Sequence, residues 1–280
     1  YSKPNFNNTD NTLFTSLKSS TTDLLTDSGY KTSELGFSLG TKFEQFMNIF
    51  LSPEIDFLIE DLETSNKASD TLKKQEGSYK DMYFNYTINQ DLRDKRFRAE
   101  SGYQTFFSQE IPLISDTAEF ANAFEISKYK KLSTKLDTVG KISFYAKTIT
   151  GLSDDVRISK RLGIPSNKLR GFEKGRVGPV DNNDYIGGNY VSALNLSATL
   201  PNILENLDNL DIGVFLDAAN IWGVDYNSSL DDKSTIRTST GVAFNLLTPI
   251  GPLSFSFANA LTKASSDKTE TFRFRLGTQF

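Results

Sequence analysis

Hydrophobic and polar residues alternate through most of the chain, and the final nine residues show the pattern clearly. In "FRFRLGTQF" large apolar residues recur at every second position, and two arginines, a glycine and a glutamine lie between them. Successive side chains of a β-strand point to opposite faces, so this stretch predicts a strand with one apolar and one polar face. The first face holds Phe272, Phe274, Leu276, Thr278 and Phe280, and the second holds Arg273, Arg275, Gly277 and Gln279.

The same period of two predicts about twelve strands. Several of them are longer than the roughly five or six residues typical of globular sheets and closer to what a tilted membrane strand needs. Short breaks, such as the one between Thr248 and Gly251, alternate with long polar connections such as 65–78, 226–235 and 263–270. The predicted strands lie near residues 12–24, 30–43, 46–60, 79–92, 101–112, 119–131, 136–149, 187–200, 210–221, 235–248, 251–262 and 271–280.

We therefore expect an all-β fold, a transmembrane antiparallel β-barrel with about twelve strands in this chain. Short turns at one end and long loops at the other are typical of outer-membrane barrels. A soluble antiparallel sandwich also alternates apolar and polar residues, and it is the alternative. The strand lengths, the even strand count and the terminal Phe280 favour the barrel. The lone Trp222 suits either an interfacial aromatic girdle or a soluble core.

Composition narrows the classes of function. The chain is 38% hydrophobic and its mean hydropathy is -0.38, and no apolar run approaches the ~20 residues of a spanning helix. It has no cysteine and no histidine, which removes thiol chemistry, the commonest general base and the commonest zinc ligand. A formal net charge of -4 argues against a nucleic-acid partner. We expect no catalytic residue and no metal site.

Two kinds of motif resemble catalytic or metal-binding sites but have simpler explanations. "GFSLG" (36–40) fits the G-x-S-x-G nucleophile elbow, yet Ser38 lies in an alternating segment of a chain without histidine, so a strand is expected. Acidic runs in the connections lack the spacing of calcium-binding loops, and we expect solvated charge there. These runs are Asp154–Asp155, Asp231–Asp232 and the "DNND" of 181–184.

Five segments toward the C-terminus form an ordered set of motifs: "LRGF" (169–172), "GGN" (187–189), "FLDAANIWGV" (215–224), "IRTSTGVAFNLLTPIGPLSFSFANAL" (236–261) and "FRFRLGTQF" (272–280). Taken in this order, they resemble the barrel of the BamA family, the outer-membrane protein assembly factors. A sixth segment, "RDKRFRAESGY" (93–103), is similar to a family segment but has Ala99 where the family usually has proline.

The resemblance implies a domain organisation. Barrels of that family have sixteen strands and follow periplasmic POTRA domains. Residues 1–280 are therefore expected to be the C-terminal portion of such a barrel, starting near its fifth strand, with no POTRA domain in this chain. Residues 1–11 are expected to be disordered or irregular, and residues 150–186 to form a long extracellular loop.

The resemblance also gives Arg170 a role. In the family, the arginine of the RGF motif lies on a long loop that folds back into the barrel lumen and contacts acidic residues of the wall. A guanidinium in a narrow lumen gains from a bidentate carboxylate and loses heavily without one. Ser197 stands where the family usually has a second acid, so the contact rests on one acid or draws on another such as Asp184. The predicted loop-lumen latch consists of Arg170, Gly171, Phe172 and Asp217.

The function implied by the resemblance is the insertion of β-barrel proteins into the outer membrane, without covalent chemistry and without a cofactor. The final strand would pair weakly with the first, opening a lateral seam where a new strand can add by edge pairing. Gly277 weakens that strand because it has no side chain to pack. The predicted seam residues are Phe272, Phe274, Gly277 and Phe280.

The alternative function is a translocation barrel of the same superfamily, of the two-partner-secretion type or TamA-like, which shares the RGF loop. The expected location is the outer membrane of a Gram-negative bacterium. The expected partners are nascent outer-membrane β-barrel proteins, lipoproteins of the assembly machine bound through POTRA domains, and outer-membrane lipid.

Overall fold

The structure, a computed structural model, describes residues 1–135, 137–201, 209–248 and 251–277. Thirteen strands form one antiparallel sheet, and β9 (Val180–Asp181) with β10 (Asp184–Tyr185) form a separate two-stranded one. No helix in these ranges is long and apolar enough to cross a membrane. The thirteen strands are β1 (Ser2–Lys3), β2 (Thr12–Leu24), β3 (Tyr30–Phe46), β4 (Ile49–Thr64), β5 (Gly77–Asp91), β6 (Gly102–Ser115), β7 (Glu119–Ser133), β8 (Thr138–Gly151), β11 (Tyr190–Pro201), β12 (Leu210–Trp222), β13 (Arg237–Thr248), β14 (Gly251–Thr262) and β15 (Phe272–Leu276).

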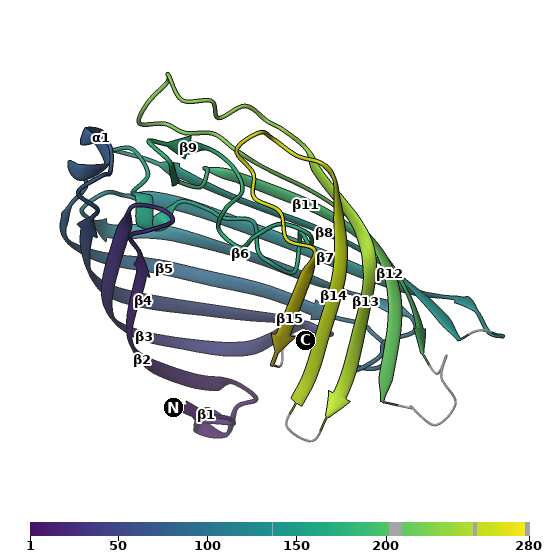
Figure 1. The fold of residues 1–280 in the computed structure, drawn as a ribbon. Helices are drawn as coiled ribbons and strands as arrows, with labels where there is room; N and C mark the ends of the chain where they lie inside the picture. The colour runs from purple at the N-terminus through teal and green to yellow at the C-terminus, as the bar shows by residue number, and fades with distance from the viewer. Residues whose placement is uncertain (136, 202–208, 249–250, 278–280) are drawn as a thin grey trace.

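The large sheet is an up-and-down meander, because its strand order follows the chain from β1 to β8 and then from β11 to β15. It curls around a central space (Figure 1). The twelve predicted strands are all present, and the sandwich alternative is wrong because these strands share a single sheet. Residues 1–11 hold only β1, which pairs with β2, and the short 3-10 helix η1 (Phe6–Asn8).

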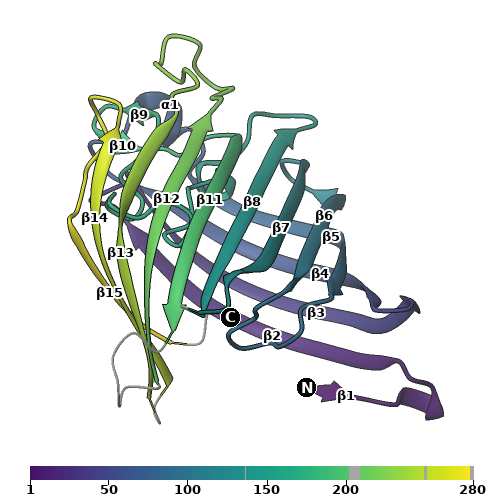
Figure 2. The same ribbon diagram turned by 90° about the vertical axis from the view of Figure 1, so that its right-hand side faces the viewer.

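The two ends of the sheet differ in their connections. At one end, which we call the loop end, lie residues 65–76, with helix α1 (Asp70–Lys73), and the connections 152–189, 223–236 and 263–271. The opposite end, which we call the turn end, includes the two residues between β3 and β4. Figure 2 shows the strands running side by side between these ends.

The pairing register gives the sheet an apolar outer face and a polar inner face. Phe37 lies opposite Phe57, their ring centroids are 6.3 Å apart, and both side chains are exposed on the outer face. On the inner face, Ser38 hydrogen-bonds Ser16 at 2.6 Å. Ser38 is thus an ordinary strand residue, as predicted. An apolar outer face with hydroxyls inside suits a wall between hydrocarbon and a polar lumen.

The last strand offers a direct test of these faces. Phe274 is 49% exposed on the outer face, and Arg275 points to the inner face. Spin labels at positions 274 and 275 of the membrane-inserted protein should respond oppositely, 274 to a lipid-soluble quencher and 275 to a water-soluble one. Equal quenching at both positions would contradict the barrel. Phe280 and Gln279 lie outside the described residues.

Candidate functional site

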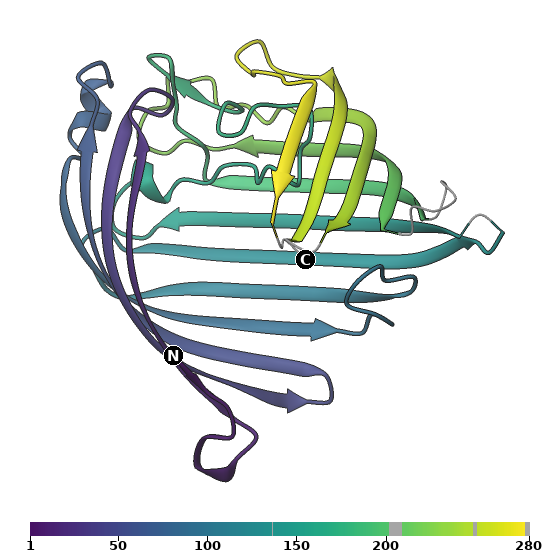
Figure 3. The ribbon, with the colours of Figure 1, turned by 60° about the horizontal axis from the view of Figure 1, so that its bottom comes forward.

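The connection between β8 and β11, residues 152–189, folds into the space enclosed by the sheet (Figure 3). It contains the 3-10 helix η2 (Ile158–Lys160) and the β9–β10 hairpin. Its apolar residues Leu169, Phe172 and Val177 pack in one buried cluster with residues of the wall such as Val191 and Ile221. The largest core of the described chain therefore lies between this loop and the inner face of the sheet.

Arg170 forms a bidentate ion pair with Asp217 of β12. Its Nε donates to Oδ2 at 2.7 Å and its Nη2 donates to Oδ1 at 2.6 Å, while its backbone N–H also donates to Oδ2 at 3.1 Å. The Asp217 side chain is fully buried and that of Arg170 is 14% exposed. The guanidinium also lies over the Phe215 ring, 3.4 Å from its centroid. The ion pair, the two parallel hydrogen bonds and the stacking on Phe215 thus hold the Arg170 guanidinium in one orientation.

The neutral amide of Asn195 completes the Arg170–Asp217 pair. Asn195 lies directly opposite Asp217 in the β11–β12 ladder, and its Nδ2 donates to Asp217 Oδ1 at 2.9 Å and to the Lys168 carbonyl at 2.7 Å. Ser197 lies two residues further on, opposite Phe215. The suggestion that Asp184 contributes is wrong, because Asp184 lies in the β9–β10 hairpin and approaches Gly29.

Gly171 and Phe172 bring the loop close to the wall beside this pair. Gly171 has a φ of 84°, and a Cβ built on it would lie 3.1 Å from the Ala258 Cβ and 3.3 Å from the Ser239 Cβ. Phe172 is 1% exposed and forms a β-bridge with Thr269. All four predicted latch residues thus lie together between the loop and the wall. Their role as a latch stays a prediction.

Alanine substitutions of Gly171 and Gly175 should separate two effects on stability: the close approach of the loop to the wall and the left-handed backbone conformation. Gly175 also has a positive φ, 74°, but a Cβ there meets no atom within 4 Å. Both alanine variants carry the strain of a left-handed residue, about 1–2 kcal/mol, and only Gly171→Ala adds tight contacts with the wall, at 3.1 and 3.3 Å. We expect Gly171→Ala to lower the free energy of unfolding measurably more than Gly175→Ala does. Equal losses in denaturant titrations would show that the close approach is unimportant.

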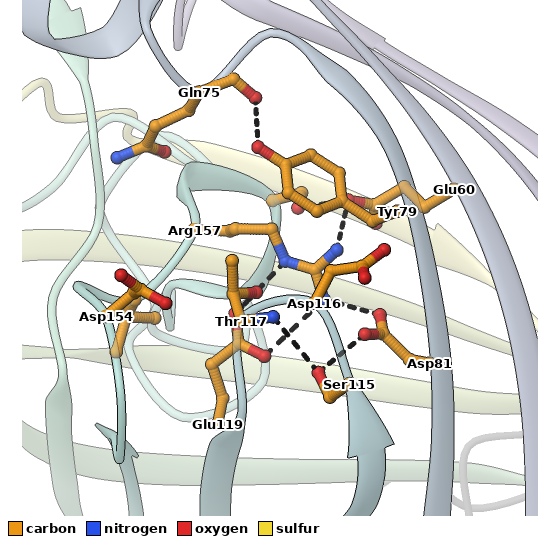
Figure 4. Close-up of polar contacts among 12 residues, drawn as sticks. Glu60, Gln75, Tyr79, Asp81, Ser115, Asp116, Thr117, Glu119, Asp154 and Arg157 are labelled. Atoms are coloured by element: carbon orange, nitrogen blue, oxygen red, sulfur yellow. Dashed lines mark hydrogen bonds and ion pairs between the residues drawn. The ribbon is translucent and has the colours of Figure 1, made fainter.

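A second arginine of the loop, Arg157, lies among three carboxylates of three strands (Figure 4). Its Nε donates to Glu119 of β7 at 3.0 Å and its Nη2 donates to Asp81 of β5 at 2.5 Å. Glu60 of β4 is 3.6 Å from Nη1, and the guanidinium stacks on the Tyr79 ring at 4.3 Å. The side chains of Arg157 and of the three acids are at most 1% exposed.

Electrostatics strongly favour the charged form of Arg157. Burial alone would lower the pKa of its guanidinium, but the charge of Glu119 and the hydrogen bonds from Arg157 to its acids outweigh burial and raise the pKa above its ordinary value. Hydroxyls also donate to two of the three acids: Tyr83 donates to Glu119 at 3.0 Å and Ser115 donates to Asp81 at 2.6 Å. The sequence prediction missed this site. The sequence feature that could have indicated it is that Glu60, Asp81 and Glu119 occupy polar positions of three separate predicted strands.

The loop-end acids are partly buried, which corrects one prediction. Asp181 and Asp184 of the "DNND" run are 6% and 7% exposed, so the expectation of solvated charge is wrong for them. Asp181 Oδ2 accepts from Ser69 at 2.6 Å and from Tyr226 at 2.8 Å. This hairpin is thereby tied to two other connections of the loop end.

The connection before β15 is also joined to the long loop. Asp267 receives two hydrogen bonds from Arg237, at 2.9 and 3.1 Å, and one from the Gly178 N–H at 3.1 Å. Arg273 of β15 donates to the carbonyl oxygens of Ser166 and Phe172. The RGF segment and the last strand are therefore in direct contact.

The last strand is short. Strand β14 has 12 residues, but β15 has five and pairs with β14 only from Leu253 to Phe257. Gly277 follows it with a φ of 133°. Within the described residues β15 pairs with no strand on its other side. Phe272 and Phe274 thus lie on a strand that pairs with β14 over five residues, Gly277 follows this strand, and Phe280 lies outside the described ranges. Their role as a seam stays a prediction.

The arrangement of these residues anchors the loop to the wall. The described part of the chain contains no group of three or more acidic side chains arranged to hold a metal ion. What the geometry provides is a set of buried ion pairs that fix one loop inside a curved sheet whose last strand is short.

Comparisons with known proteins agree with this architecture. The outer membrane protein assembly factor BamA of Neisseria meningitidis serogroup B is 27% identical over 263 residues, covering 78% of this chain and 32% of that protein. The BamA of Neorickettsia risticii is 24% identical over 218 residues, covering 76% of this chain and 29% of that protein. The chain thus spans about a third of the length of these curated relatives.

Among solved structures, BamA from Haemophilus ducreyi lacking POTRA domains 1-3 matches with a TM-score of 0.82 at 20% identity, covering 98% of this chain and 60% of that chain. CdiB from Escherichia coli matches with a TM-score of 0.54 at 11% identity, covering 94% of this chain and 48% of that chain. These likenesses show the barrel fold. The model of the Omp85 superfamily domain matches residues 1–280, so this chain, with its loop anchored inside an outer-membrane barrel, belongs to the Omp85 superfamily.

Proposed function

We propose that the chain is the barrel wall of an outer-membrane insertase, which assembles β-barrel proteins without covalent chemistry and without a cofactor. The observation that carries this proposal is the short last strand, five residues beside a twelve-residue neighbour. The unpaired backbone groups of an edge strand form a template for another strand. In hydrocarbon such groups carry a large penalty, so pairing with an incoming strand is strongly favoured.

The anchored loop favours insertion at the edge over passage through the lumen. To admit a polypeptide, the lumen would have to release a loop held by the Arg157 and Arg170 ion pairs and by the buried cluster around Phe172. Edge pairing needs no such release. The anchored loop and the match to the relatives named as assembly factors therefore favour insertion over the translocation barrel.

The proposed partners follow from this activity. Substrates are unfolded β-barrel proteins that present a free strand edge, and lipid of the outer membrane surrounds the apolar face. Lipoproteins of the assembly machine would bind through POTRA domains, which this proposal places outside the 280 residues.

Photo-crosslinking in the complete protein tests the proposal. A photoreactive amino acid is placed at Phe274 on the edge strand, at Phe144 on the outer face of β8, or at Asn245 on the inner face of β13. During assembly of an unfolded barrel substrate, we expect crosslinks from position 274 and none from 144. Capture mainly from position 245 would show lumenal passage and would contradict the insertase.

A further inference from the structure

The outer face of the sheet has an apolar hollow of about 560 Å³ near the turn end of β7, β8, β11 and β12. These strands run side by side in Figure 2. Two rows of paired residues cross the hollow. One row runs from Lys128 through Ile142, Leu196 and Leu216 to Thr240, and the other runs from Lys130 through Gly140 and Ala198 to Val214.

The hollow exists because its centre lacks side-chain volume. Ala198 has only one methyl group, and beside it the Leu132 side chain lies against Gly140, where a Cβ would be 2.8 Å from the Leu132 Cδ1. Ile142, Leu196 and Val214 around them are exposed apolar residues. A volume of several hundred Å³ with an apolar floor is typical of sites for small hydrophobic ligands. On the lipid-facing side of a barrel, the available ligand of this chemistry is an acyl chain.

Both rows begin with a lysine, and these two positive charges determine which kind of lipid headgroup fits beside the hollow. Lys128 and Lys130 are exposed on one face of β7, about 7 Å apart, within a few residues of its end at Ser133. Within the described residues neither has an ion pair, whereas Lys31 on the outer face of β3 pairs with Glu63 at 3.8 Å. Lysine stems lie along apolar surface while their ammonium groups reach the polar boundary. There the two charges complement a phosphate.

We propose that this hollow binds one anionic phospholipid, with an acyl chain over Ala198 beside Leu132 and the phosphate between Lys128 and Lys130. The site lies on β7 to β12, on strands other than β15. It would hold a lipid against the wall and position the barrel in the leaflet at the turn end. It does not depend on the insertase proposal.

The test uses the complete protein in micelles that contain equal amounts of phosphatidylglycerol and phosphatidylcholine, with retained lipids counted by native mass spectrometry. The native protein should retain phosphatidylglycerol at least tenfold over phosphatidylcholine. Lys128→Ser/Lys130→Ser should bring this ratio close to one. Ala198→Phe, which fills the hollow and keeps both charges, should reduce retention of either lipid severalfold.

Lys80→Ser is the matched control, because Lys80 is an exposed lysine on the outer face near the loop end of β5. It should leave both the ratio and the retention unchanged. An unchanged ratio in the double lysine variant, an equal drop in Lys80→Ser, or full retention by Ala198→Phe would each overturn the proposed site.

Discussion

Replacing Asp217 by alanine is expected to lower the free energy of unfolding of the barrel by about 3–5 kcal/mol, the range for breaking a buried ion pair. The Arg170 guanidinium would keep its place against Phe215 but lose both of its carboxylate hydrogen bonds. Asn195 cannot replace the lost negative charge, because its side chain is neutral. Denaturant titration of the folded protein measures the loss, and assembly of the protein in cells should fall with it.

A double-mutant cycle separates a direct pair from two independent effects. Arg170→Ala should also destabilise, and Arg170→Ala/Asp217→Ala should lose clearly less than the sum of the single variants, because neither charge is then left alone. Arg170→Lys should rescue poorly, since an ammonium cannot form the bidentate fork. Strict additivity would mean that the two residues do not act on each other.

An ion pair with a more exposed arginine provides the control. Arg98 pairs with Asp211 at 2.8 Å, and its side chain is 43% exposed. Arg98→Ala should change the free energy of unfolding by about 1 kcal/mol or less, because solvent already screens an exposed pair. A loss as large as that of Asp217→Ala would undermine the argument from burial.

Arg157→Met is expected to destabilise the protein by a similar amount, again about 3–5 kcal/mol. Three buried carboxylates would then face one another without a counter-charge, and they would repel as well as remain desolvated. The first structural consequence should be release of the segment around η2 from the wall. Hydrogen exchange of the backbone amides of residues 156–162 would report that release.

Neutralising the acids should compensate for the loss of the arginine. Asp81→Asn/Glu119→Gln in the Arg157→Met background removes two of the three charges and preserves side-chain size. We expect this variant to recover part of the lost stability, although the same two substitutions destabilise the native protein. No recovery would show that Arg157 acts through packing on Tyr79 and not through charge.

Much of the fold could be predicted because a strand has a period of two and the chain repeats it twelve times. Phe272, Phe274 and Leu276 could be assigned to one face from their spacing alone, and the structure exposes all three on the outer face. The loop carrying Arg170 and the strand carrying Asp217 were identified through a resemblance. The contact of Arg157 with Glu60, Asp81 and Glu119 had no such guide.

The sequence by itself determined the strands, their two faces and the location of the long connections, because alternation is a local property of neighbouring residues. Only the tertiary structure decided which acid meets which cation. Asn195 faces Asp217 because of the β11–β12 register, and Asp181 is buried because the loop end folds over it. Such pairings depend on register and desolvation, which arise between segments far apart in the chain.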